Sequence, residues 1–229
     1  IPIATKDDNS TRLVHSWPGS LHAYGLEIST GPVVPFRAIP LIAKTGTVPD
    51  THAPFLWMHN IMPMRVQWPT DTRGKEQYIS IGAAARSLLV DNKNYVLLRR
   101  FSAKEQRRRL TAAPHLARSV NSQFIGLENH LNYVHRPKGS LSEEEVYGLA
   151  VLFNSALLDT YFRTYNGNTQ VSATELRAMP LPPLEDIVEL GKRAMSGCIV
   201  NTVDDIDTLI QEALNVDTLA LSVHGAAHG

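Results

Sequence analysis

Positive charge is concentrated between Lys93 and Arg118. This stretch carries eight Lys or Arg residues against one acid, Glu105, which gives a net charge of +7. Guanidinium groups in such a run suit recognition of phosphate or guanine, because their planar fork binds at two points. Composition alone favours the alternative of a solvated hairpin, whose charges keep an edge strand from aggregating.

The polar loop from Asn166 to Gln170 is the second candidate for binding chemistry. Within it, Asn168, Thr169 and Gln170 offer amide and hydroxyl groups, which hydrogen-bond bases and phosphates. The alternative is a helix terminator in which Asn and Gly take left-handed backbone positions. The residues alone favour this terminator.

The nine histidines are the residues that could serve metal or acid–base chemistry. His130 and His135 lie five positions apart on a predicted strand, which places them on opposite faces. His224 and His228 have i,i+4 spacing but no carboxylate nearby. A self-contained hydrolase that uses these histidines is therefore the least favoured function.

Common enzyme motifs are absent from the sequence. It contains no Gly-x-Ser-x-Gly elbow, no Gly-x-x-x-x-Gly-Lys-Ser/Thr loop and no Gly-x-Gly-x-x-Gly loop, the motifs that present a nucleophile or cradle phosphates. We therefore expect a recognition module that is not an enzyme by itself, with no catalytic residue, no metal and no cofactor in this chain.

The net charge is zero but unevenly placed. Lys and Arg number 22, as do Asp and Glu, while Pro182–Ala220 carries eight acids against two bases, a net charge of −6. This asymmetry predicts one half that faces a polyanion and another that faces solvent or protein. The hydrophobic content of 43% supports a packed core.

Cysteine usage and hydropathy bear on the cellular compartment. Cys198 is the only cysteine, so no internal disulfide can form and a reducing compartment is expected. No run reaches the roughly 20 apolar residues that span a bilayer, and no secretory signal pattern is present. These features favour a cytoplasmic protein with no membrane partner.

The elements that must position the basic run have a period of two. Asn94–Phe101 and Arg107–His115 are expected to pair as a hairpin, with Arg107 and Arg109 on one face. Phe55–Trp68 is broken by a proline and is expected to be irregular or an edge strand. Further strands are expected at Thr11–Trp17, Leu26–Gly31, Gln77–Ile81, Ser122–Leu127 and His130–His135, after a polar tether over residues 1–10.

After residue 141 the period changes to 3.6. Ser142 and Glu145 have the spacing of a capping box, and one apolar stripe then runs from Val146 to Tyr161. This pattern predicts a single long helix over Ser142–Arg163, with Gly167 as its stop signal.

A second capping-box spacing follows the polar loop. Ser172 and Glu175 predict a short helix from Ala173, which the prolines at 180, 182 and 183 should end. Two further helices, at about 184–196 and 203–214, make an acidic helical tail.

Three segments together resemble a known family. They are Tyr95–Lys104, Leu152–Phe162 and Gly167–Arg177, closing on Met179–Pro182. They are similar to the C-terminal specificity domain, or target recognition domain, of TaqI-like adenine-N6 DNA methyltransferases of restriction-modification systems. The resemblance covers residues 20–183, and its most specific part is the helix–loop–helix from Ser142 to Pro182.

The resemblance implies a DNA-binding function and favours it for the basic hairpin. In that family the domain reads the target sequence in double-stranded DNA, while a separate N-terminal domain, here expected in the same polypeptide, holds S-adenosylmethionine and methylates a flipped adenine. The family's catalytic tetrapeptide, Asn-Pro-Pro followed by an aromatic residue, is absent from this sequence. The residues expected to contact DNA are Arg99, Arg100, Lys104, Arg107, Arg109, Asn168, Thr169 and Gln170.

We therefore expect an α+β fold with a mixed, largely antiparallel sheet, a long helix packed on it, and a small C-terminal helical tail. The expected organisation is a tether over 1–10, a DNA target recognition domain over 11–183, and an acidic helical tail over 184–229. The alternative function is a protein-interaction module that docks a methyltransferase or nuclease partner through its acidic helices.

Overall fold

The computed structural model describes residues 6–102, 105–165, 170–196 and 202–214. The α-helices are α1 (Lys6–His15), α2 (Glu143–Asn154), α3 (Ala156–Tyr165), α4 (Ala173–Arg177), α5 (Leu184–Met195) and α6 (Val203–Leu214). The strands are β1 (Glu27–Thr30), β2 (Ile42–Ala43), β3 (His52–Leu56), β4 (Ile61–Met62), β5 (Arg65–Val66), β6 (Tyr78–Ser80), β7 (Leu89–Asp91), β8 (Tyr95–Arg99), β9 (Ala112–His115), β10 (Phe124–Leu127) and β11 (Leu131–His135). Short 3₁₀ turns include η2 (Pro35–Arg37), η3 (Ile39–Leu41) and η4 (Met58–Asn60).

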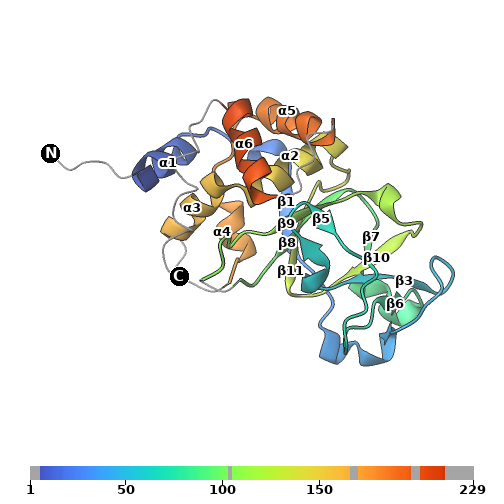
Figure 1. The fold of residues 1–229 in the computed structure, drawn as a ribbon. Coiled ribbons are helices and arrows are strands. Elements are labelled where there is room, and N and C mark those ends of the chain that lie inside the picture. Colours follow the sequence, from blue (N-terminus) through green and yellow to red (C-terminus); the bar gives the residue numbers. More distant parts are fainter. Residues whose placement is uncertain (1–5, 103–104, 166–169, 197–201, 215–229) are drawn as a thin grey trace.

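The elements form layers. Helices occupy one end of the molecule, a five-stranded sheet of order β2-β6-β3-β10-β7 occupies the other, and a four-stranded sheet of order β1-β11-β8-β9 lies between them (Figure 1). A two-stranded hairpin of β4 and β5 completes the strands. All strand pairs are antiparallel except β3 with β10. The predicted α+β class is confirmed, with the strands divided among three sheets.

The central strand β8 is apolar on both faces because both faces are covered. Val96 and Leu98 belong to the core that packs against the helices, whereas Tyr95 and Leu97 belong to the core between the two large sheets. Alternate residues of a strand point to opposite faces, so the continuous run of apolar residues reports a buried sheet rather than an amphipathic one.

Strand β3 includes only the first two residues of Phe55–Trp68, and the rest of this segment is irregular, as predicted, with η4 and the two-residue strands β4 and β5. Strand β3 lies at the centre of the five-stranded sheet, between β6 and β10, and Phe55 is fully buried. Pro63, the proline that predicted the break, follows β4 in the small hairpin within this irregular part. The strands predicted around Leu26, Gln77, Ser122 and His130 are confirmed as β1, β6, β10 and β11.

The predicted single helix over Ser142–Arg163 is broken at Ser155. This residue has an extended backbone, and its hydroxyl accepts a hydrogen bond from Leu158 N at 3.2 Å. Serine is a preferred N-cap, so a second helix, α3, starts here. The capping box at Ser142 is confirmed. Nine of the twelve residues of α2 are buried, so this helix is buried on most sides and not along a single apolar stripe as expected.

Helix α5 packs tightly on α2 through two glycines. A Cβ atom at Gly148 would lie 1.9 Å from the carbonyl oxygen of Ile187, and one at Gly191 would lie 1.9 Å from that of Glu144. Each helix therefore presents a glycine where the backbone of the other passes. The two predicted acidic helices are confirmed as α5 and α6, and their apolar residues are part of the same core as α2.

The N-terminal segment is helical where a strand was expected. Helix α1 covers the last part of the predicted tether and most of the predicted strand Thr11–Trp17. Val14 is fully buried in the core that contains α2 and α3, and Trp17 packs against it. The strand over Thr11–Trp17 was expected because Leu13, His15 and Trp17 occupy alternate positions, and this prediction is wrong. None of the helices in the described ranges is long and apolar enough to span a bilayer.

Candidate nucleic-acid interface

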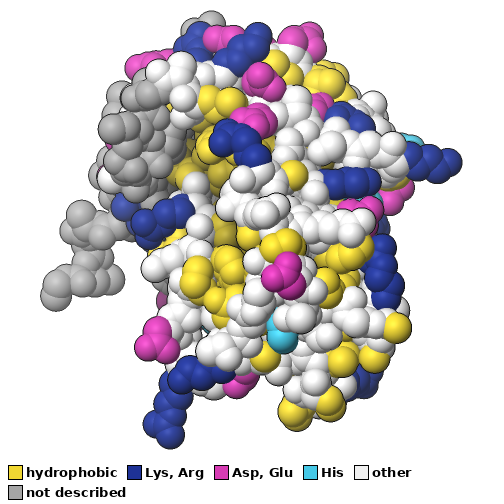
Figure 2. Space-filling view, turned by 90° about the vertical axis from the view of Figure 1, so that its right-hand side faces the viewer, with side chains coloured by type: hydrophobic (Ala, Val, Ile, Leu, Met, Phe, Trp, Pro, Cys, Tyr) yellow, Lys and Arg dark blue, Asp and Glu magenta, His cyan; other side chains and the backbone are white. Residues whose placement is uncertain are grey.

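Basic side chains do not form one continuous block on the face seen in Figure 2. Lys and Arg stand mainly near the margins there, with Asp and Glu interspersed. The predicted concentration of charge at 93–118 therefore has to be followed residue by residue. Much of it is neutralised within the fold, as the segment between β8 and β9 shows.

The return strand of the basic hairpin is shorter than predicted. Only Ala112–His115 pairs with β8, and residues 105–111 follow an irregular path. The expectation that Arg107 and Arg109 share a strand face is therefore wrong. The reason is that this segment is held by carboxylates of the helical layer, which offer stronger partners than a β-ladder would.

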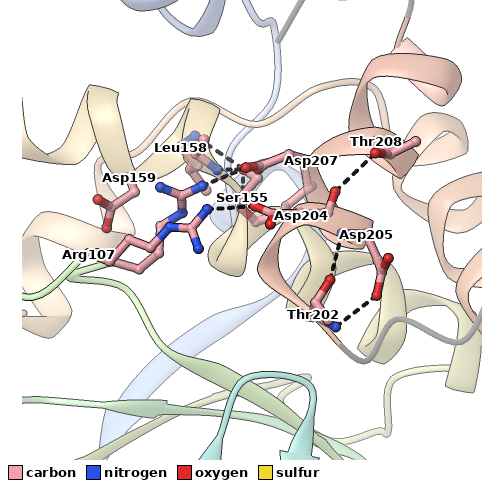
Figure 3. Close-up of polar contacts among 12 residues, drawn as sticks. Arg107, Ser155, Leu158, Asp159, Thr202, Asp204, Asp205, Asp207 and Thr208 are labelled. Atoms are coloured by element: carbon pink, nitrogen blue, oxygen red, sulfur yellow. Dashed lines mark hydrogen bonds and ion pairs between the residues drawn. The ribbon is translucent and has the colours of Figure 1, made fainter. Parts of the chain in front are cut away.

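Arg107 and Arg108 pair with α6. Arg107 Nη2 lies 2.5 Å from Asp204 Oδ1, and Figure 3 shows these side chains facing each other across the gap between the segment and the helix. The pair is open to solvent, with side chains 56% and 69% exposed. Arg108 makes the corresponding contact with Asp207 Oδ2 at 2.5 Å, but there the exposures are only 16% and 10%.

Asp207 connects this contact to the helix break. Its Oδ1 accepts a hydrogen bond of 2.7 Å from the backbone N–H of Ala156, at the start of α3. Burial raises the pKa of the Asp207 carboxyl, while the N–H of Ala156 and the guanidinium of Arg108 act in the opposite direction. A carboxylate at a helix N-terminus is favourable, so α6 stabilises both the basic segment and the α2–α3 junction.

Arg109 is buried, with 3% of its surface exposed. Asp159 of α3 accepts hydrogen bonds from the backbone N–H groups of Arg109 and Leu110 at 2.6 and 2.9 Å, and from Arg163 Nε at 2.7 Å. The Arg109 guanidinium lies 5.3 Å from the ring centroid of Phe162. In this structure Arg109 is a packing residue that DNA cannot reach, which corrects its place among the expected contacts.

Arg99 and Arg100 lie where the two large sheets meet. Arg99 donates from Nε to the carbonyl oxygen of Ile61 at 2.6 Å, and burial lowers the pKa of its guanidinium. Arg100 donates from Nη1 to the carbonyl oxygen of Asn129 at 3.1 Å. Both side chains are half-buried, so each retains exposed surface beside its contact.

Four strand ends converge at this place. The parallel strands β3 and β10 end together, because Leu56 is in register with Leu127. Leu131 at the start of β11 is in register with Arg99 at the end of β8. The loops that follow these ends therefore lie side by side, which brings residues from distant parts of the sequence to one edge.

The loop after β3 contributes His59 and meets Lys75. Lys75 Nζ lies 4.0 Å from the ring centroid of Trp57, and the His59 ring lies 6.3 Å from that of Trp57 in a stacked arrangement. Burial lowers the pKa of His59, and the charge of Lys75 lowers it further. His59 is therefore biased toward its neutral form, in which one ring nitrogen donates and the other accepts.

The loop after β10 contributes Glu128 and His130. Glu128 is buried, and its Oε2 accepts from Met58 N at 2.8 Å while its Oε1 lies 2.9 Å from His130 Nδ1. The His130 ring meets Phe101 edge-on at 5.0 Å between centroids. Glu128 thus ties the loop after β3 to the loop after β10 and orients His130.

Gln170 reaches the same edge through the backbone. It forms an isolated antiparallel bridge with Phe101, and Val171 N donates to the carbonyl oxygen of Arg100 at 2.7 Å. We name the resulting set the junction strip, which consists of Lys75, His59, Arg99, His130, Arg100 and Gln170. Of the other expected contacts, Lys104, Asn168 and Thr169 lie outside the described residues.

Sequence reasoning missed three members of the junction strip. In the sequence, His59 and His130 have no partner at metal-ligand spacing, and Lys75 ends the stretch Thr70–Lys75, which is predicted to be a loop. The signal available for Lys75 was Arg73-Gly74-Lys75, two bases around a glycine that has a φ of +71°. In the part of the chain that the structure describes, no group of three or more His, Cys, Asp or Glu side chains could hold a metal ion.

The comparisons with known proteins agree on one group of enzymes. The chain is 34% identical over 212 residues to the type II methyltransferase M.BsuBI of Bacillus subtilis, and 33% identical over 199 residues to the type II methyltransferase M.PstI of Providencia stuartii. These matches cover 90% and 87% of this chain but 41% and 38% of the relatives. The chain is thus homologous to about two fifths of each.

A solved structure shares the fold. The type IIG restriction endonuclease BpuSI matches with a TM-score of 0.50 and 16% sequence identity, over 91% of this chain and 28% of that one. At this identity the match shows the fold alone. No protein-family model matches the sequence.

Proposed function

We propose that this chain recognises a specific sequence of double-stranded DNA on behalf of a restriction-modification methyltransferase. The observation that carries the proposal is the 34% identity to a type II methyltransferase across 90% of the chain. The match covers 41% of that relative, which leaves room in the larger protein for a separate catalytic domain.

The junction strip supports DNA as the ligand. Cationic Lys75, Arg99 and Arg100 would neutralise phosphates and set the register of the duplex. His59 Nε2 lies 3.2 Å from Thr70 Oγ1, so Nδ1 is the ring nitrogen that neutral His59 would offer to a base. The amide of Gln170 is a group that can both donate and accept hydrogen bonds, as base edges in a groove require. The junction strip therefore combines cations that can bind phosphates with groups that can discriminate between bases.

The basic segment would contribute less than the sequence suggested. Arg109 is buried and Arg108 is mostly buried against Asp207, so Arg107 is the member of this group with an open side chain. A charge reversal at Arg107 and Arg109 together would disrupt buried contacts and would not isolate DNA contact. Substitutions in the junction strip are the sharper test.

Methylation of adenine at N6 is the activity that the family resemblance implies for the whole enzyme. We place S-adenosylmethionine and the catalytic residues in a separate domain of the same polypeptide. The catalytic tetrapeptide of the family, Asn-Pro-Pro followed by an aromatic residue, is absent from this sequence. No step of methyl transfer is assigned to the residues of this chain.

The alternative is a module that binds a protein partner through its acidic helices. Such a module needs carboxylates that are available to bind the partner protein. On α6, however, Asp204 and Asp207 pair with Arg107 and Arg108 of the same chain. This internal pairing favours DNA recognition over docking through α6.

The proposal is tested by the salt dependence of DNA binding. Binding of the full chain to duplex DNA is measured by fluorescence anisotropy over a range of salt concentrations, for the unaltered chain, Lys75→Gln and Lys192→Gln. Each lost phosphate contact should reduce the slope of log affinity against log salt by about 0.9. We expect this reduction for Lys75→Gln, together with weaker binding.

Lys192→Gln is the matched control, because Lys192 is exposed on α5, which lies in the helical layer (Figure 1). It should leave the slope unchanged. Equal slopes for the two variants would remove Lys75 from the interface. Absence of any salt-dependent binding by the unaltered chain would refute DNA recognition itself.

A further inference from the structure

We infer that Phe36 and Ile39 form an apolar wedge that enters the base stack of DNA beside the junction strip; this rests on the proposed function. These two side chains are 71% and 65% exposed, the highest exposures among the large hydrophobic residues that the structure describes. Single exposed hydrophobic residues are ordinary, but here two lie three positions apart in the double turn that η2 and η3 form, Phe36 in η2 and Ile39 in η3.

The double turn of η2 and η3 is firmly held. Pro35 and Pro40 fix the backbone at both ends, and prolines restrict φ to a narrow range. Arg37 N donates to the carbonyl oxygen of Val34 at 2.9 Å, and Ala38 N donates to that of Pro35 at 2.9 Å. The exposure of Phe36 and Ile39 is therefore built into an ordered turn.

One end of the turn is anchored beside Arg100. Val33 is fully buried, donates to the carbonyl oxygen of Leu127 at 3.0 Å, and accepts from Asn129 N at 2.8 Å. The carbonyl oxygen of the same Asn129 accepts from Arg100. Asn129 therefore links Val33 to Arg100 of the junction strip, and Phe36 lies three residues after Val33 in the sequence.

The middle of the turn is buried in the core that also contains Trp57. Ala38 is 1% exposed and belongs to the same core cluster as Trp57, the residue whose ring contacts Lys75. The turn is therefore tied by hydrogen bonds to the Arg100 side of the strip, and it shares a core cluster with Trp57, whose ring contacts Lys75. A duplex that lies along the strip would meet Phe36 and Ile39.

Size and charge favour DNA as the occupant over a protein. Two apolar side chains are far smaller than the roughly 800 Å² that each partner contributes to a stable protein interface, but they match one base step. Proteins that bend DNA insert such Phe or Ile side chains between bases. Arg37, whose guanidinium lies 5.3 Å from the ring centroid of Phe36, adds a cation at the same place.

The wedge is tested with 2-aminopurine, whose fluorescence rises when the base is unstacked. The probe replaces each adenine in turn in a duplex that the full chain binds. We expect a rise at one step for the unaltered chain, its loss in Phe36→Ala, and roughly 5-fold to 100-fold weaker binding by that variant. The salt slope should stay unchanged, because no phosphate contact is removed.

Met195→Ala is the matched control, since Met195 is 40% exposed on α5 and lies far from the strip; it should preserve the signal. Phe36→Leu should retain much of it, because leucine can also act as a wedge. A full signal in Phe36→Ala, with binding intact, would overturn the wedge and leave the proposed function standing. Failure of the unaltered chain to bind DNA would overturn both.

Discussion

Asp159 and Asp204 each bind part of the basic segment, but in different surroundings. Asp159 is 3% exposed and satisfies two backbone N–H groups and Arg163, whereas the side chain of Asp204 is 69% exposed and pairs with Arg107. A buried acceptor that is lost leaves its donors without partners, which costs far more than the loss of a solvated ion pair. The two acids should therefore differ sharply in their effect on stability.

We expect Asp159→Ala to lower the free energy of unfolding by about 3–5 kcal/mol and Asp204→Ala by about 0–1 kcal/mol. Urea unfolding of both variants, followed by circular dichroism, checks this difference. Similar losses for the two substitutions would mean that the basic segment is not held through Asp159.

His115 should make the fold sensitive to acid. It is buried, Asn92 Oδ1 lies 2.8 Å from its Nε2, and burial lowers the pKa of its imidazole to about 4. The unfolded chain, with an ordinary pKa near 6.5, therefore binds the proton more tightly than the folded one. The stability due to neutral His115 is complete above about pH 6.5 and is lost as the pH falls toward 4.

The size of this loss follows from the difference in pKa and is about 3 kcal/mol. We expect the free energy of unfolding to fall across this pH range, and to fall less steeply in His115→Gln. His59 and His135, whose pKa values burial also lowers, should keep part of the slope. An identical pH profile for the variant, measured by urea unfolding at several pH values, would contradict the assignment to His115.

At the scale of elements, the contact between α2 and α5 depends on the missing side chains of Gly148 and Gly191. A methyl group at either position would meet a backbone carbonyl at 1.9 Å, and backbone cannot move aside as a flexible side chain can. Gly148→Ala should therefore lower the free energy of unfolding by roughly 1–3 kcal/mol. Gly191→Ala should cost a similar amount.

The two alanines together should cost less than the sum of their separate effects, because the first already pushes the helices apart. Gly82→Ala is the control, since a Cβ there would meet only Ser80 Oγ at 3.4 Å. Thermal unfolding of Gly148→Ala, Gly191→Ala, the double variant and Gly82→Ala measures these differences in stability. A harmless Gly148→Ala would show that the helices are not in close backbone contact.

Local sequence signals predicted the elements that local chemistry determines. The capping boxes at Ser142 and Ser172 are both formed, and the strand preceding the basic turn is β8 as expected. The break at Ser155 was missed because the apolar residues keep their 3.6 period across it. The acid that supports the break, Asp207, comes from α6, far along the chain.

At the scale of the whole molecule, distant charges neutralise each other. The basic run and the acidic tail were expected to face different partners, yet Arg107 pairs with Asp204, 97 positions away. Pairings of this kind depend on tertiary packing, which single-sequence patterns do not contain. Arg99, Arg100 and Gln170 were expected separately as DNA contacts, which stays a prediction, and their assembly with Lys75 at one edge depends on the packing of the two sheets.

The layered arrangement explains why that edge suits recognition. Strand ends of two packed sheets position the junction strip, and Glu128 fixes two of its loops to each other. Side chains placed by a rigid scaffold lose little freedom on binding, which favours discrimination between sequences. The proposed function therefore requires that the chain select a DNA sequence, rather than merely attract DNA through charge.

The most direct measurement is selection of bound duplexes by the full chain from a random DNA library at moderate salt. Sequencing the retained DNA over successive rounds should yield one short motif. A duplex with that motif should then compete far better than a scrambled duplex of equal length. Retention of random sequences without enrichment, or no retention at all, would contradict the proposed function.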